Sequence, residues 1–322
     1  MNNPLLNNEK TGLLNLILLI FSVLLSLFFP VSTFVWAYAI LGPLHYLTQL
    51  NWLYNRPIYS LNRSFGYLLI GISVLATLIF LAQYFNLLTL DWLSYVNISA
   101  CLIILAILLT LKYILKLKWS VILIILIPVV IIAYFFSSNY YYLILFGILL
   151  TSVIHVYIFT LFHMISGALK TKNIIDFINS FLMIITPIII YLIPVPSVQF
   201  DYIDSNDFIK DIINNLSYFM GYKNVTVTSF VKLAWFVSFS YLYHYLNWFS
   251  KTKIIQWDSS LTRKKTIIFC SISLCCSLIF LIKFEYGLIA TLLLSYLHVF
   301  AEFPLNYHSI MNIYRAIFSQ AK

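Results

Sequence analysis

Long apolar segments limit the possible folds of this chain more than any other feature. A helix that crosses a bilayer needs ~20 mostly apolar residues. Hydrophobic residues make up 62% of the chain and charged residues only 9%, so we expect an all-α polytopic integral membrane protein forming one transmembrane domain over residues 1–322. The segments that meet the length criterion, ten in number, cover residues 12–30, 32–51, 65–87, 93–115, 119–136, 141–169, 174–195, 228–250, 266–283 and 287–314.

The loop charges predict the orientation of these spans. Cytoplasmic loops collect Lys and Arg, and alternate loops of this chain differ strongly in their content of both. Lys210, Lys223, Lys232 and Lys283 fall on one side, and the other 15 of the 19 basic residues fall on the side of the N-terminus. We therefore expect both termini in the cytoplasm, and a protein of the bacterial inner membrane.

The net charge of +9 suggests anionic lipid headgroups as partners rather than nucleic acid, because the basic residues lie in short loops between apolar runs. The one long loop, 196–227, falls on the outer side. Within it Phe208, Ile212, Leu216 and Phe219 recur at helical spacing, which predicts an amphipathic helix lying on the membrane surface. A solvated loop with one helical turn is the alternative.

The histidines are distributed unevenly among the predicted spans. All six lie on even-numbered spans, near the middle of the span or nearer its cytoplasmic end, and they are His45, His155, His163, His244, His298 and His308. Ionisable residues inside a membrane usually face the bundle interior and pair with each other, with water or with an ion. We therefore predict that these imidazoles converge on a metal ion, although a hydrogen-bonded structural role is the alternative for any one of them.

Glu302 is the only carboxylate well within a predicted span. It follows His298 by four residues, and this spacing places both side chains on one face of a helix. We predict that both bind the same cation; the alternative is a neutral carboxyl group, or one paired with a histidine without metal. Gln49 lies four residues after His45 and Asn247 three after His244, so these amides are predicted to orient the imidazole rings from a second shell.

Imidazole with one carboxylate suits iron, zinc, copper or manganese, and no thiolate is placed to select a softer metal. Iron is the first choice, because a mostly histidine shell beneath the lipid headgroups fits oxygen-dependent attack on an apolar substrate that enters from the bilayer. The scatter of histidines over several spans resembles the histidine-rich polytopic iron enzymes, namely the Brp/Blh-type carotene dioxygenases and, more distantly, the membrane fatty-acid desaturases and hydroxylases. The resemblance covers architecture only, since the chain has neither HxxxH nor HxxHH.

This resemblance implies oxidation or cleavage of a long polyene or acyl chain, with O2 as co-substrate and possible need of an electron donor. The number of metal ions is left open. Two other classes of protein would use the same histidines: a haem-binding electron-transfer protein, and a proton- or metal-coupled transporter. The chain has only 8 glycines, which argues against the broken helices that transporters often use.

Overall fold

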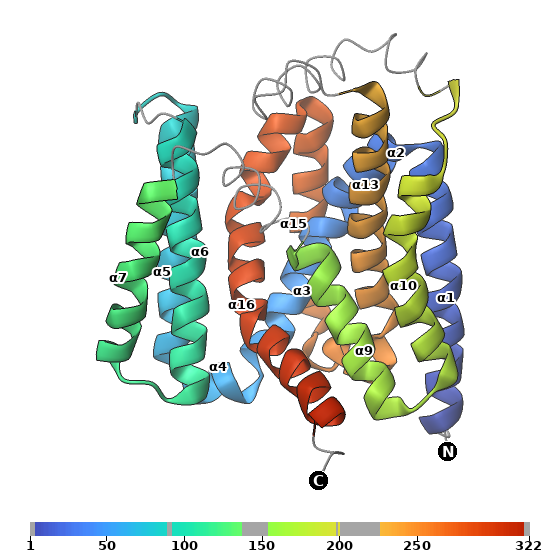
Figure 1. The fold of residues 1–322 in the computed structure, drawn as a ribbon, viewed down its shortest axis with the longest axis horizontal. Coiled ribbons are helices and arrows are strands. Elements are labelled where there is room, and N and C mark those ends of the chain that lie inside the picture. The colour runs from blue at the N-terminus through green and yellow to red at the C-terminus, as the bar shows by residue number, and fades with distance from the viewer. Residues whose placement is uncertain (1–3, 89–91, 137–153, 198, 200–225, 319–322) are drawn as a thin grey trace. The chain divides into compact units, whose positions relative to one another are not determined.

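The computed structural model describes residues 4–88, 92–136, 154–197, 199 and 226–318, and every regular element in these ranges is helical (Figure 1). The prediction of an all-α protein is therefore confirmed. The chain divides into two compact units, residues 1–37 with 140–250 (unit 1) and residues 38–139 with 251–322 (unit 2). That residues 1–322 act as one transmembrane domain stays a prediction.

Unit 1 is built around α13, which packs against α1, α2 and α10, while α9 packs against α10. Its core is aromatic, with Trp235, Phe239 and Tyr243 aligned at intervals of four residues along one face of α13. Pro30 begins α2 at its first turn, where the missing N–H of a proline costs nothing. The helices of unit 1 are α1 (Pro4–Phe28), α2 (Pro30–Trp36), α9 (Thr160–Thr171), α10 (Ile174–Leu192) and α13 (Val227–Ser250).

Unit 2 is built around its last helix, α16, which packs against α3, α5, α6 and α15. This helix has 35 residues and stays continuous through Pro304. The elements of unit 2 are η1 (Ala37–Leu41, its first residue belonging to unit 1), α3 (Gly42–Tyr54), α4 (Pro57–Leu61), α5 (Arg63–Tyr84), α6 (Trp92–Leu115), α7 (Trp119–Phe136), α14 (Thr252–Ile255), η3 (Trp257–Ser260), α15 (Arg263–Ile282) and α16 (Phe284–Phe318).

The predicted second span, 32–51, contains an irregularity that the apolar pattern does not reveal. Here α2 passes into the π-helical turn η1 before α3 begins. Pro43 lacks the N–H that would bond the Ala39 carbonyl. The Ser277 hydroxyl on α15 donates to that carbonyl at 2.8 Å instead, and Ser273 donates to the Ile40 carbonyl at 3.4 Å. The irregular turn therefore keeps its carbonyls hydrogen-bonded, as a low-dielectric environment requires.

In the described ranges, five helices are long and apolar enough to cross a membrane: Glu9–Phe28, Arg63–Tyr84, Ile174–Leu192, Arg263–Ile282 and Phe284–Phe318. They correspond to predicted spans 12–30, 65–87, 174–195, 266–283 and 287–314. Several apolar helices indicate a membrane protein, while the count of ten spans stays a prediction. The segments 93–115, 119–136 and 228–250 are also helical. Residues 141–153 of the sixth span and nearly all of the 196–227 loop, including its amphipathic helix, lie outside the described residues.

The turn between α15 and α16 offers a direct test of orientation. The distribution of Lys and Arg among the loops predicts that this turn lies on the outer side, although it carries Lys283. The Lys283 ammonium lies 2.7 Å from the Glu285 carboxylate, which balances the positive charge. The turn after α9, with Lys170 and Lys172, is predicted inside. Reporter domains fused after residue 283 and after residue 172 should therefore report opposite sides of the membrane. A reporter result that places both on one side would contradict the predicted topology.

Gly287 provides a test of the packing between α15 and α16. A methyl group at this position would overlap the ring of Phe280, which is itself buried. Gly287→Ala should therefore lower the free energy of unfolding by ~1–3 kcal/mol, the usual cost of overpacking, with a lower thermal unfolding temperature as the readout. Gly71→Ala on α5 is the matched control, because nothing lies within 4 Å of its added methyl group and helix propensity favours alanine. Equal stability of the two variants would show that α15 and α16 pack differently.

Candidate metal centre

The structure separates the seven predicted ligands by their exposure to solvent. His163 is half-buried and His308 is exposed. The other five side chains are buried, each with less than a tenth of its surface accessible: His45, His155, His244, His298 and Glu302. Glu302 is the only Asp, Glu, Lys or Arg in the described residues that is buried. The buried five therefore form the stronger part of the prediction, and they fall into one group in each unit.

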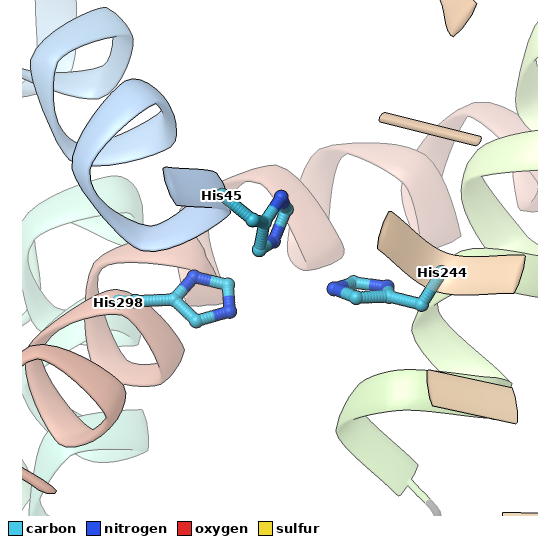
Figure 2. Close-up of side chains that lie close together, drawn as sticks. All are labelled: His45, His244 and His298. Atoms are coloured by element: carbon cyan, nitrogen blue, oxygen red, sulfur yellow. The ribbon is translucent and has the colours of Figure 1, made fainter. Parts of the chain in front are cut away.

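In unit 2, His45 on α3 and His298 on α16 lie side by side (Figure 2). Their ring centroids are 4.8 Å apart and the ring planes are nearly perpendicular, at 85°. A ring nitrogen of one residue lies within 4.8 Å of a ring nitrogen of the other. Only 1% of each side chain is exposed. Figure 2 also draws His244, which belongs to α13 of unit 1.

Glu302 joins this pair from α16. One of its carboxylate oxygens lies within 4.8 Å of a ring nitrogen of His298, as the predicted spacing of four residues requires. The helix remains regular across Pro304, so the two side chains share one face of α16. Inside unit 2, His45 and Glu302 thus each place a ligand atom within 4.8 Å of a ring nitrogen of His298.

Two tyrosines outside the predicted set of ligands hold this arrangement. The ring of Tyr46 stacks on that of His298, with centroids 4.8 Å apart and planes at 25°. The hydroxyl of Tyr59, on α4, donates to the Ala301 carbonyl at 2.6 Å. Burial, and secondarily the charge of Glu302, raise the pKa of Tyr59, so this hydroxyl keeps its proton. Tyr46 therefore fixes a ring, and Tyr59 fixes the turn of α16 that carries Glu302.

In unit 1, His155 and His244 form the second group, with ring centroids 5.5 Å apart. Thr160, the first residue of α9, lies 2.7 Å from Nδ1 of His244. The Thr160 hydroxyl also lies 2.7 Å from the Val156 carbonyl oxygen. When its single proton is donated to that carbonyl, the His244 ring donates from Nδ1 and Nε2 carries a lone pair. This is the tautomer that metal-binding histidines commonly adopt through their second partner.

π-Helical turns accompany both groups. His155 lies within a π-helical stretch at residues 154–159, and η1 ends immediately before α3, the helix of His45. Such turns insert one extra residue into a helix and are frequent at functional sites. The insertion rotates the following residues about the helix axis, which changes the direction in which a side chain points. No simple pattern of apolar residues signals it.

The two amides predicted as second-shell residues are both buried. Gln49 is 2% exposed and Asn247 is 7% exposed. The Gln49 Oε1 and the Asn247 Oδ1 accept no hydrogen bond from any described residue. Their role in orienting the imidazoles stays a prediction. Thr160, by contrast, does contact a ring nitrogen, Nδ1 of His244.

Every candidate ligand atom in the two groups is an imidazole nitrogen or a carboxylate oxygen, and the described residues include no cysteine in any group of candidate ligands. Imidazole and carboxylate suit iron, zinc, copper and manganese. The chain matches no family model, no curated protein and no solved structure. The chemistry of the side chains therefore carries the functional argument.

Thr160→Val tests the second-shell contact in unit 1. The change removes the hydroxyl with little change of shape, so the proton on His244 is no longer fixed at Nδ1. We expect metal affinity to fall ~10–100-fold, the usual effect of losing such a partner. Metal content after dialysis against a graded chelator measures it. Thr186→Val is the control, because the Thr186 hydroxyl donates to the Leu182 carbonyl of its own helix; an equal loss in both variants would contradict the role of Thr160.

Proposed function

We propose that this protein is a membrane-embedded, metal-dependent oxidoreductase that uses O2 to oxidise a long apolar, lipid-like molecule. The proposal places it in the bacterial inner membrane with both termini in the cytoplasm. The substrate then enters from the cytoplasmic-side leaflet. The observation that carries the proposal is the buried group of His45, His298 and Glu302.

The geometry of the two imidazoles supports one shared metal ion. A metal–nitrogen bond of ~2.0–2.1 Å puts an imidazole centroid ~3 Å from the ion. Two imidazoles at adjacent coordination positions, ~90–110° apart, then have centroids ~4.5–5 Å from each other. The observed separation of 4.8 Å fits this arrangement. The same reasoning gives ~6 Å for imidazoles on opposite faces of a haem, so His45 and His298 do not suit the haem alternative.

Iron is the proposed metal. Two histidines and one carboxylate, with positions left open, are the donor set of non-haem iron(II) oxygenases. The Glu302 carboxylate offsets part of the charge of the ion, and its burial needs such a positive partner. His155 and His244 offer two further imidazoles in unit 1. One or two metal ions per chain are therefore the outcomes that elemental analysis distinguishes. His163 and His308 stay predicted ligands.

The need for an electron donor depends on the reaction. Cleavage of a double bond that places both oxygen atoms of O2 in the products needs no external electrons. Hydroxylation or desaturation reduces O2 further and takes two electrons from a donor in each turnover. Turnover by the purified protein, with and without a chemical reductant, separates these two reaction types.

Metal content tests the proposal. We expect protein produced with ample iron, zinc, copper and manganese to carry a bound transition metal, most of it iron, without the Soret absorption band of haem. His298→Ala, His45→Ala and Glu302→Gln should lower metal affinity by more than the ~10–100-fold that a second-shell loss costs. The fold should survive, as judged by the helical circular dichroism signal.

Glu285→Gln is the matched control for Glu302→Gln. Glu285 lies on the same helix, at its exposed first turn, and the change of charge is the same. Its metal content should equal that of the wild type. Full metal occupancy in both Glu302→Gln and His298→Ala would overturn the proposed centre in unit 2.

A further inference from the structure

Asn306, on α16, is a buried amide that the fold does not explain. Only 2% of the side chain is exposed, and neither its nitrogen nor its oxygen has a hydrogen-bond partner among the described residues. A buried polar group without a partner costs ~1–3 kcal/mol, and such groups are rare in folded proteins. The residue lies well inside the helix, so it caps neither end. A leucine of nearly the same shape would serve packing better.

The position of Asn306 connects it with the proposed metal centre. It lies four residues after Glu302 and eight after His298 on α16, so the three side chains follow one face of the helix. Successive members of such a row have Cβ atoms ~5–6 Å apart. Asn306 therefore extends the row of metal-binding candidates by one helical turn, away from His298.

Helix α3 adds a second buried amide to this region of unit 2. Gln49 lies one turn after His45 on the same face of α3, and its Oε1 accepts no hydrogen bond from the described residues. The helices α3 and α16 pack against each other and run in the same direction (Figure 1). Because His45 lies beside His298, Gln49 follows His45 in the direction in which Glu302 and Asn306 follow His298. Two buried amides that have unpaired hydrogen-bonding atoms thus lie one helical turn beyond the candidate ligands of their own helices.

The chemistry of these groups indicates the ligand. A carboxamide offers both a donor and an acceptor, which suits a group that also does both, such as a hydroxyl. A carboxylate head group only accepts hydrogen bonds, so it would leave the amide oxygens of Asn306 and Gln49 without a donor. A neutral polar end on an otherwise apolar molecule fits both the amides and the carboxylate.

We propose that Asn306, with Gln49, hydrogen-bonds a neutral hydroxyl group of a long-chain alcohol, holding it beside His45, His298 and Glu302. This inference rests on the proposed function, because oxidation of the bound alcohol requires the proposed metal centre. It adds the class of substrate. Asn306 is a substrate-positioning residue here and not a metal ligand.

Binding of three probes of equal chain length tests the inference. Tritiated palmityl alcohol is bound to the full-length protein in lipid nanodiscs and competed with unlabelled palmityl alcohol, palmitate or hexadecane. Wild type should prefer the alcohol to both competitors. Asn306→Leu should weaken binding of the alcohol about tenfold, as loss of one good hydrogen bond does, and leave hexadecane unchanged. Gln49→Met, which keeps the length of the side chain, should act in the same direction.

Stability and metal content separate this role from others. Asn306→Leu should unfold at the same temperature as wild type or higher without a probe, because an apolar isostere replaces an unpaired amide. Its metal content should not change. A lower unfolding temperature, or failure to fold, would show a structural amide and overturn the inference; loss of metal would overturn it by making Asn306 a ligand. Asn312→Leu, a partly exposed position on α16, should keep the preference for the alcohol.

Failure of the proposed function gives a different result. Wild-type protein that carries no metal but prefers palmityl alcohol, with the preference lost in Asn306→Leu, would retain the binding site and refute the oxidoreductase. Metal-loaded wild type that binds palmityl alcohol and hexadecane equally would refute the binding site and retain the metal centre.

Discussion

A carboxylate buried among apolar helices is the constraint on which the arrangement of unit 2 depends. Removing such a group from water costs several kcal/mol unless hydrogen bonds and a positive charge offset the loss. Glu302 lies on the central helix of the unit, and α3 brings His45 to the neighbouring His298. The phenol of Tyr59 holds the adjacent carbonyl of Ala301. Packing of α16 by four other helices of unit 2 thus serves to keep one acidic side chain beside the groups that stabilise it.

The π-helical turns give up regular helical hydrogen bonds and change the direction in which the following side chains point. In an apolar medium a carbonyl that loses its helical partner needs another donor. Ser277 supplies one to Ala39 in η1. In unit 1 the Thr160 hydroxyl lies 2.7 Å from the Val156 carbonyl oxygen of the π-helical stretch and 2.7 Å from Nδ1 of His244. One hydroxyl there contacts both the backbone and an imidazole, so the local irregularity and the site share the same atoms.

The parts of this structure that sequence could predict are those set by local spacing. Hydropathy runs give the helices because the length of a span and its apolar content are local quantities, and the spacing of His298 and Glu302 gives their shared face. Thr160 was missed, since a threonine gains its role only when a distant part of the chain supplies an imidazole. Asn306 was missed because an amide in a helix is ordinary until its burial and its lack of partners are known. The interruption of the predicted span 32–51 by η1 depends on two serine hydroxyl groups of α15. These lie more than 230 residues away in sequence, so no local pattern contains them.

The balance of charge ties the proposed centre to the proposed substrate. Neutral imidazoles and a single carboxylate would leave a divalent ion in unit 2 with one uncompensated positive charge, and charge interactions are strong where water is excluded. A carboxylate on the substrate would cancel that charge before any reaction begins. A neutral alcohol would leave that charge available, and a bound metal ion would then stabilise negative charge developing on O2, the kind of interaction that lowers a reaction barrier most effectively. The neutral imidazoles and the uncharged amide of Asn306 are consistent with one another on this view, because neither adds negative charge to that of Glu302.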